Sequence, residues 1–206
     1  MKKGIFISLE GGEGAGKSAQ MDFIKKWFEY NEIPFVSTRE PGGTDLGEEV
    51  KNIIKYSTYK ICDRAELMLF NACRAELMDD VIIPNLEKGV CVIADRFLDS
   101  TYAYQCCGRG LSKNDVEYMC NFATNGVKPD YTFWLDITPA AAFARKNGAD
   151  QTDRIETADL SFHERVYAGY KELNEKESRF IRIDATKNIA EVSKQIETQL
   201  NKIFNK

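Results

Sequence analysis

The sequence predicts an α/β fold with three layers, in which helices cover both faces of a five-stranded parallel sheet. Five short apolar runs alternate with longer helical segments along the chain, the order that produces a parallel sheet. The run at 90–94, Val-Cys-Val-Ile-Ala, is apolar throughout, as expected for a strand at the centre of such a sheet. A glycine-rich turn joins the first apolar run to the first helical segment.

The first elements follow this alternation closely. A strand at 5–9 precedes a helix at 17–30, in which aromatic and aliphatic residues recur every three to four positions. A second strand at 33–38 leads to a helix at 45–54, and the loop between them is punctuated by proline and glycine.

A long helix is predicted over residues 64–88, because its centre is apolar nearly all round and so indicates burial. Pro84 is expected to kink this helix and Gly89 to end it. The apolar strand at 90–94 follows directly.

The second half of the chain continues the alternation. Ser112 with Asp115 resembles a capping box, and Pro139 suits the first position of a helix. The remaining predicted elements are helices at 99–107, after Ser112, from Pro139, at 160–175 and at 189–204, and strands at 131–136 and 180–184.

The composition narrows the class of protein. A length of 206 residues fits one domain over 1–206, and a hydrophobic fraction of 43% is enough for a core. The net charge of −4 indicates neither nucleic acid nor an anionic membrane as a partner. Six cysteines without a C-x-x-C pair, and a single histidine, argue against a zinc site. Since no apolar run approaches membrane-spanning length, we expect a cytoplasmic protein.

Residues 11–18 match G-x-x-x-x-G-K-[ST], the P-loop that cradles phosphates, and they lie between a predicted strand and a predicted helix. Glycines let successive backbone N–H groups turn toward one anion, and the helix adds its positive N-terminal end. Lys17 can reach the β- and γ-phosphates, and Ser18 can offer its hydroxyl to Mg²⁺. The residues expected to bind a nucleoside triphosphate are Gly11, Gly12, Glu13, Gly14, Ala15, Gly16, Lys17 and Ser18.

Charged residues recur at the carboxyl ends of the predicted strands, where open α/β sheets bind ligands. This recurrence indicates phosphoryl transfer between two bound groups. Asp95 is placed like a Walker-B carboxylate near Mg²⁺, and Arg96 could bind a substrate phosphate through its planar fork. The alternative is an Asp–Arg pair that only seals a strand end. The charged strand ends are Glu10, Arg39 with Glu40, Asp95 with Arg96, Asp136 and Asp184.

Two further features have open alternatives. Phe70 and Arg74 share a helix face, where a ring could stack on a base and a guanidinium could meet its carbonyl. Spacing alone favours the alternative, in which Phe70 is a core residue and Arg74 pairs with Glu66, Glu40 or another carboxylate. Glu13 is an acidic residue inside a phosphate-binding loop, so it either faces a cation or hydroxyl or is a solvated loop charge.

The polar stretch at 145–157 has the position of a lid, which could exclude water and bring positive charge to the transferring phosphoryl group. Its cations are Arg145, Lys146 and Arg154. The alternative is a simple surface loop. His163 lies on an amphipathic helix and is expected to have a surface or capping role.

Together these residues resemble the thymidylate kinase (dTMP kinase) family in its bacterial form. The resemblance covers nearly the whole chain and rests on segments 10–18, 38–44, 95–97, 100–105 and 153–156. The Arg-Glu-Pro-Gly-Gly segment and the Asp-Arg pair, in this order after a P-loop, are highly specific, whereas the P-loop alone is not.

The resemblance implies the reaction ATP + dTMP ⇌ ADP + dTDP in dTTP biosynthesis, with Mg²⁺, on a P-loop nucleoside monophosphate kinase fold that is usually a homodimer. It implies a catalytic set of Lys17, Arg96, Arg145, Arg154 and Glu13, and a metal set of Ser18, Asp95 and Glu13. The resemblance also implies the contacts to dTMP. Arg39 and Arg96 flank its phosphate, Phe70 stacks on thymine, and Arg74 meets the carbonyl edge of the base. Thr101 contacts the base, Tyr104 screens out a 2′-hydroxyl, and Glu13 lies near the 3′-hydroxyl; Ser100 and Gln105 complete the set.

One departure from the family concerns the lid. Members without a basic residue among the variable P-loop positions usually carry several lid arginines, yet this lid offers only three cations. We expect Arg145 or Arg154 to meet the transferring phosphoryl group, with Lys146 in reserve.

Two rival functions stay open at this point. A deoxynucleoside kinase, or another small P-loop kinase, would phosphorylate a hydroxyl and would need Glu10 or Glu13 as a base. A P-loop switch that hydrolyses nucleotide to regulate a partner is the second rival, although the base-reading N-K-x-D of GTPases is missing.

Overall fold

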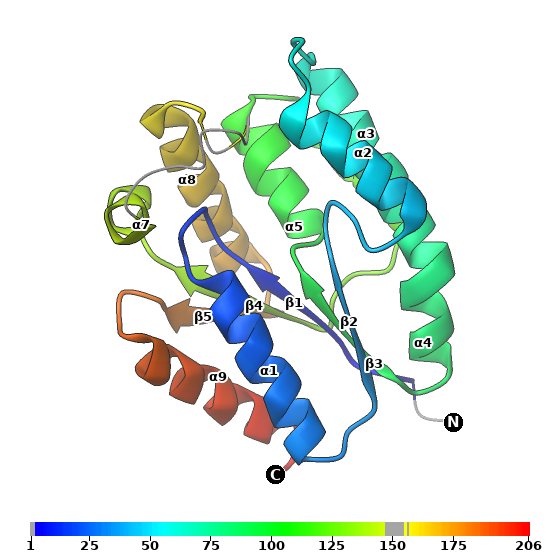
Figure 1. Cartoon of the computed structure of the whole chain (residues 1–206), viewed down its shortest axis with the longest axis vertical. Helices are drawn as coiled ribbons and strands as arrows, with labels where there is room; N and C mark the ends of the chain where they lie inside the picture. The colour runs from blue at the N-terminus through cyan, green and yellow to red at the C-terminus, as the bar shows by residue number, and fades with distance from the viewer. Residues whose placement is uncertain (1–2, 147–154, 156) are drawn as a thin grey trace.

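Five parallel strands form one sheet in the order β2-β3-β1-β4-β5 in the computed structural model, which describes residues 3–146, 155 and 157–206, with the backbone alone at Lys146. All neighbouring strands are parallel, so their carboxyl ends meet at one edge of the sheet (Figure 1). The predicted sheet is therefore confirmed. Its strands are β1 (Phe6–Glu10), β2 (Phe35–Arg39), β3 (Cys91–Asp95), β4 (Tyr131–Asp136) and β5 (Phe180–Asp184).

Helices cover both faces of the sheet because successive side chains of a strand point to opposite faces. Ile7 and Leu9 of β1 pack with α1 (Lys17–Tyr30) and α9 (Ile189–Phe204), whereas Phe6 packs on the opposite face. The helices on that opposite side are α2 (Asp45–Tyr56), α3 (Asp63–Leu77), α4 (Ile83–Glu87), α5 (Leu98–Thr101), α6 (Lys113–Thr124) and α8 (Leu160–Lys176).

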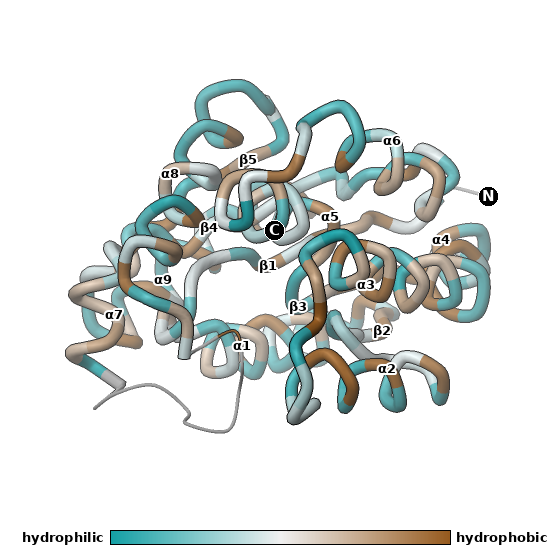
Figure 2. The backbone as a smooth tube through the Cα atoms, turned by 90° about the horizontal axis from the view of Figure 1, so that it is seen from above, coloured by the Kyte–Doolittle hydropathy of each residue, from teal (hydrophilic) through white to brown (hydrophobic). Residues whose placement is uncertain are grey.

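Local signals set the helix starts. Thr44 caps α2 by accepting a hydrogen bond from the Gly47 N–H, and Ser112 caps α6 as predicted. α7 (Pro139–Lys146) starts with proline, also as predicted. Figure 2 shows hydrophobic and hydrophilic positions alternating along α2 and α9, as in helices with one packed and one outward side. Within the described residues, no helix has the length and hydrophobicity that crossing a lipid bilayer requires.

Two π-helical turns depart from the predicted helices. The predicted helix at 64–88 changes to a π-turn, η1 (Met78–Ile82), directly before α4, and Pro84 lies in the first turn of α4. Proline has no N–H for an α-helical hydrogen bond, so the α-helical hydrogen-bond pattern is interrupted where η1 changes to α4. The predicted helix at 99–107 is α5 followed by η2 (Tyr102–Gly108), and η2 lines the functional cavity described below.

The expectation for His163 is wrong. Its side chain is buried, and its ring makes edge contacts with Phe143 at 4.9 Å and Phe162 at 5.2 Å between ring centroids. Asp159 caps α8 instead, by accepting a hydrogen bond from the Phe162 N–H at 2.8 Å. The ring is enclosed because α7 packs against the first turn of α8, a tertiary contact that helical periodicity does not report.

Candidate active site

A cavity of about 520 Å³ opens where the strands end. The P-loop forms one side, and the loop after β2, α2, α3 and η2 form the other. This is the edge at which the sequence predicts a site. The residues of the predicted sets that line it are Glu13, Gly14, Ala15, Gly16, Lys17, Ser18, Arg39, Phe70, Arg74, Asp95, Arg96, Ser100, Thr101, Tyr104, Gln105 and Arg145, whereas Gly11 and Gly12 lie behind them.

The P-loop has a backbone that only glycine adopts readily. Gly14 has a φ of 72°, and Gly16 has a φ of 91° and forms the left-handed cap of α1. The Lys17 ammonium group donates hydrogen bonds to the carbonyl oxygens of Gly11 at 3.1 Å and Gly12 at 3.0 Å. Burial and the neighbouring Arg96 charge lower the pKa of Lys17. The P-loop therefore holds the Lys17 ammonium group at the opening of the loop, beside its backbone N–H groups.

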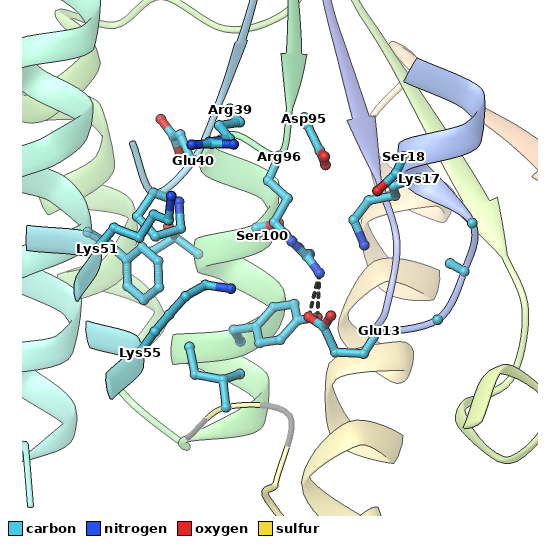
Figure 3. Close-up of a pocket in the computed structure, with 18 of the residues that line it drawn as sticks. Glu13, Lys17, Ser18, Arg39, Glu40, Lys51, Lys55, Asp95, Arg96 and Ser100 are labelled. Carbon is cyan, nitrogen blue, oxygen red and sulfur yellow. Dashed lines mark hydrogen bonds and ion pairs between the residues drawn. The ribbon is translucent and has the colours of Figure 1, made fainter. Parts of the chain in front are cut away.

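Arg96 joins the two sides of the cavity (Figure 3). Its guanidinium group forms an ion pair with the Glu13 carboxylate at 2.6 Å, and it donates to the Gly11 carbonyl oxygen at 3.0 Å. It also donates to the hydroxyl groups of Ser100 at 3.1 Å and Tyr104 at 3.1 Å. The Arg96 backbone is left-handed, with a φ of 70°, which is unusual for a residue with a side chain. The ion pair and hydrogen bonds of its side chain hold Arg96 in this conformation.

Glu13 faces a cation, which is one of the two alternatives left open above. The Tyr104 hydroxyl donates a hydrogen bond to the same carboxylate oxygen that pairs with Arg96, at 2.9 Å. Burial alone would raise the pKa of Glu13, but the charges of Arg96 and Lys17 outweigh it and lower the pKa to about 2. Glu13 is therefore an ionised carboxylate at neutral pH.

Asp95 has the properties of a ligand for a hard cation. Its buried Oδ1 atom has no hydrogen-bond partner within the described part of the chain. Figure 3 shows the carboxylate across from Ser18 and Lys17. No group of three potential metal-ligating side chains occurs among the described residues. Mg²⁺ in nucleotide enzymes typically takes one or two protein oxygens together with phosphate oxygens and water, so Asp95 and Ser18 fit that ion.

Arg74 is buried and its charge is neutralised by Glu40. The guanidinium group binds both Glu40 carboxylate oxygens, with Nη2 to Oε2 at 2.5 Å and Nε to Oε1 at 3.0 Å. It also donates to the Thr101 hydroxyl at 2.8 Å. The pairing favoured on spacing alone is present, yet Arg74, Phe70 and Thr101 also line the cavity. Its Nη1 atom donates to the Asn71 side-chain oxygen at 3.3 Å and to the Cys120 sulfur at 3.5 Å, so all five donors of the guanidinium have acceptors in the protein. The pairing is therefore what the structure shows, and a contact of Arg74 with a base carbonyl stays a prediction.

Cations on α2 were missed by the sequence reasoning. Lys51 and Lys55 line the cavity, and Figure 3 shows both facing it. Glu48 pairs with Lys51 at 2.6 Å and with Arg39 at 3.0 Å, and these hydrogen bonds lower the pKa of Glu48 to about 2. The signal was available: two lysines four residues apart share one face of a helix.

Glu10 and Tyr170 form a buried polar centre beneath Arg96. The Glu10 carboxylate accepts hydrogen bonds from the Phe97 N–H at 2.7 Å, the Ser100 hydroxyl at 2.6 Å and the Tyr170 hydroxyl at 2.9 Å. Burial, with a smaller contribution from the nearby Asp99 charge, raises the pKa of Glu10 to about 7. Tyr170 was not predicted, because it lies 160 residues from Glu10 and carries no local signal.

The other two strand-end carboxylates do not reach the cavity lining. Asp136 binds the Arg182 guanidinium at 2.5 Å and accepts from the Tyr167 hydroxyl at 2.9 Å. Asp184 accepts from both the backbone and the hydroxyl of Thr186. Both carboxylates therefore fasten β4 and β5 to neighbouring segments, and only part of the charged row predicted at the strand ends belongs to the site.

The predicted lid falls largely outside the described residues. Arg154 and the side chain of Lys146 lie outside them. Arg145 is described: its guanidinium donates to the carbonyl oxygens of Ala185 at 2.5 Å and of Thr186, and it also lines the cavity. In this structure Arg145 ties the end of α7 to the loop after β5.

Arg96 bridges the P-loop, which ends in Lys17-Ser18, and the opposite wall, and the Asp95 oxygen near them has no protein partner among the described residues. At the edge of a parallel sheet, such a site is that of a P-loop nucleotide kinase. Comparison with known proteins narrows this class. The family model described as thymidylate kinase matches residues 9–196. The chain therefore belongs to the thymidylate kinase family, as the sequence resemblance implied.

Individual relatives agree with the family match. A thymidylate kinase of Kosmotoga olearia is 41% identical over 193 residues, covering 93% of each chain. One from Carboxydothermus hydrogenoformans is 40% identical and covers 92% of this chain and 93% of its own. One from Francisella tularensis subsp. holarctica is 40% identical and covers 97% of both.

Proposed function

We propose that this chain transfers the γ-phosphoryl group of ATP to the phosphate of dTMP, which yields ADP and dTDP for dTTP synthesis. One observation carries the proposal: Arg96 contacts the Gly11 carbonyl of the P-loop at 3.0 Å while facing the cavity wall that holds Phe70 and Arg74. An acceptor phosphate bound by Arg96 therefore lies beside a triphosphate bound by the P-loop. Membership of the thymidylate kinase family supports the choice of dTMP as acceptor.

The mechanism is in-line transfer without a covalent enzyme intermediate. The dTMP phosphate oxygen is the nucleophile, so the protein contributes position and charge neutralisation. Lys17 and Arg96 neutralise the donor and acceptor phosphates. Ser18 and Asp95 would hold Mg²⁺, and the ion would supply positive charge near the transferring group. Glu13 holds Arg96 and stands as a second candidate near the metal.

The cavity lining supports the acceptor contacts that the family resemblance implies. Arg39 and Arg96 flank the dTMP phosphate, Phe70 stacks on thymine, and Arg74 meets a base carbonyl with its orientation already held by Glu40. Ser100, Thr101, Tyr104 and Gln105 complete the wall. The family resemblance supports a role for Tyr104 in screening out a ribose 2′-hydroxyl.

A kinase that phosphorylates a hydroxyl group is disfavoured by the ionisation and hydrogen bonding of Glu13 and Glu10, the two candidate bases. Glu13 has a pKa of about 2 and is paired with Arg96, so it is a weak base. Glu10 already accepts three hydrogen bonds from Phe97, Ser100 and Tyr170. Glu13 therefore lines the cavity but is a weak base, and Glu10 does not line the cavity.

An acceptor screen tests the function. ADP release is measured with Mg²⁺-ATP and dTMP, dUMP, dCMP or thymidine, and we expect dTMP to be the best acceptor. Phosphorylation of thymidine but not dTMP would overturn the proposal in favour of a deoxynucleoside kinase. Equal ATP hydrolysis with and without an acceptor would favour a hydrolysing switch.

We also propose that the active form is a homodimer. Large apolar side chains are exposed on α2, α3 and α6, which pack side by side, and such patches on soluble proteins commonly mark interfaces. These side chains are Leu46, Ile53, Tyr56, Met68, Tyr118 and Phe122. The cytoplasmic location, and small molecules rather than nucleic acid or membrane as partners, stay predictions of the sequence.

The dimer is tested by measuring the mass in solution by light scattering for the native chain and for Phe122→Glu. We expect a mass twice that of one chain, shifted toward the monomer by the variant, because a charge would be buried at the interface. Tyr30→Glu is the matched control, because Tyr30 is also a highly exposed aromatic residue but lies on α1. An unchanged mass for Phe122→Glu would contradict this interface.

A further inference from the structure

Glu66 is a buried carboxylate beside the cavity that the proposed function does not use. It lies on α3 and is 1% exposed. Glu66, Phe70 and Arg74 are spaced four residues apart and therefore form one row along the helix. The Glu66 carboxylate accepts a hydrogen bond from the Gln105 side-chain Nε2 at 2.9 Å. It thus lies one helical turn from the wall against which we place the base.

Arg109 keeps Glu66 ionised. The Arg109 guanidinium donates to both carboxylate oxygens, with Nε to Oε1 at 3.1 Å and Nη2 to Oε2 at 3.2 Å. The same guanidinium lies over the Phe162 ring at 4.5 Å from its centroid. A buried carboxylate bound in this two-pronged way by arginine carries its charge and has no proton to donate.

An ionised Glu66 fixes the orientation of the Gln105 amide. The amide must turn its NH₂ group to the carboxylate, because its own carbonyl oxygen would otherwise face another acceptor. The Gln105 side chain is almost fully buried and lines the cavity. Within the described residues, the amide oxygen accepts no hydrogen bond from the protein. The amide therefore offers an acceptor to whatever occupies the cavity.

We propose that Glu66 is the positioning residue for pyrimidine selectivity, since it holds Gln105 with its acceptor toward the base. The N3 atom of thymine or uracil carries a proton and can donate to that oxygen. The N3 atom of cytosine is itself an acceptor and meets the amide oxygen unfavourably. The site then discriminates by leaving an acceptor pair unsatisfied, which is an effective way to reject a near-isosteric ligand. This inference rests on the proposed function, which places the base between Phe70 and Gln105.

The test compares kcat/KM for dTMP, dUMP and dCMP in the native enzyme and in Glu66→Gln. An amide at position 66 can donate or accept, so the Gln105 amide becomes able to turn over. We expect the preference for dTMP over dCMP to fall about 10-fold, the scale of one unsatisfied buried group. The preference for dTMP over dUMP should not change, because both bases carry the N3 proton.

The double variant Glu66→Gln with Gln105→Glu is the rescue. A carboxylate at position 105 can only accept, whichever way it turns, so the preference against dCMP should return to within about threefold of the native value. If Glu66→Gln does not fold, as judged by thermal unfolding, Gln105→Leu replaces it. This variant should lower kcat/KM for dTMP and dUMP but not for dCMP, because cytosine loses only an unfavourable contact between two acceptors.

The outcomes distinguish a failure of the positioning role from a failure of the proposed function. Equal losses for all three nucleotides in Glu66→Gln, or in Gln105→Leu, would overturn the positioning role and leave the kinase activity intact. A native enzyme that phosphorylates none of the three would instead overturn the proposed function.

Discussion

The P-loop presents backbone groups of consecutive residues to its ligand, whereas the opposite wall presents side chains from α3, η2 and the loop after β3. The P-loop depends on backbone angles, such as the φ of 72° at Gly14. The opposite wall depends on ion pairs, such as Arg96 with Glu13 and Arg74 with Glu40. The P-loop should therefore be sensitive to added Cβ atoms, and the opposite wall to lost charges.

Arg96→Ala should have the largest effect. It removes a side chain that contacts both walls and leaves the Glu13 carboxylate without the cation it pairs with. We expect kcat/KM for dTMP to fall about 10³-fold, the scale of an arginine that stabilises a transferring phosphoryl group. Steady-state kinetics measures it. Arg96→Lys is the matched control: it keeps the charge without the fork and should recover only part of the loss. A loss below about 10-fold would contradict the bridging role.

Gly14→Ala should break the P-loop through its backbone. An added Cβ would lie 2.7 Å from the Ala142 carbonyl oxygen, at a φ that disfavours side chains. We expect kcat/KM for ATP to fall about 100-fold, as for a displacement of about 1 Å in a catalytic site. Gly12→Ala is the matched control, because an added Cβ there has no heavy atom within 4 Å among the described residues. Equal effects of the two variants would show that backbone geometry does not limit this wall.

Glu10 and Glu13 should give opposite pH dependences of stability. The pKa of Glu10 is raised to about 7, so the folded protein favours its protonated form. That contribution is full below the ordinary pKa of 4.5 and is lost as the pH rises through about 7. Glu13, with its pKa lowered to about 2, stabilises the fold above pH 4.5 and loses that contribution as the pH falls.

The measurement is the free energy of unfolding by urea between pH 5 and pH 8. Relative to Glu10→Gln, which cannot titrate, the native protein should lose about 2 kcal/mol as the pH rises across this window. Glu13 stays ionised throughout, so it does not contribute to the difference. Parallel profiles for the two proteins would contradict the raised pKa of Glu10.

The lid cations should give the smallest effect of the series. Single alanine substitutions of Arg145, Lys146 and Arg154 are compared in kcat, and we expect at least one to lower it about 10-fold or more. Lys202→Ala on α9 controls for the loss of one exposed charge. If all three lid variants keep kcat within a few-fold of the native value, the P-loop and Arg96 neutralise the transferring group without the lid.

Elements with strong local signals were predictable. The ranges predicted for α1, β4, β5 and α9 coincide with the structure. α1 starts at the P-loop lysine, and α9 starts at the Asn188 capping box. The π-turns η1 and η2 were not predicted, because an α-helix and a π-turn bury the same kinds of residue. The burial of His163 was missed for a different reason, since it depends on packing against a neighbouring helix.

The sequence by itself determined the parallel sheet, the phosphate-binding loop and the edge at which the site lies, because each depends on residues close together in the chain. Only the tertiary structure decided which charges pair there. Arg74 meets Glu40 from 34 residues away, and Glu10 meets Tyr170 from 160 residues away. A pattern of apolar residues reports that a side chain is buried, but its hydrogen-bond partner is set by which elements the fold brings into contact.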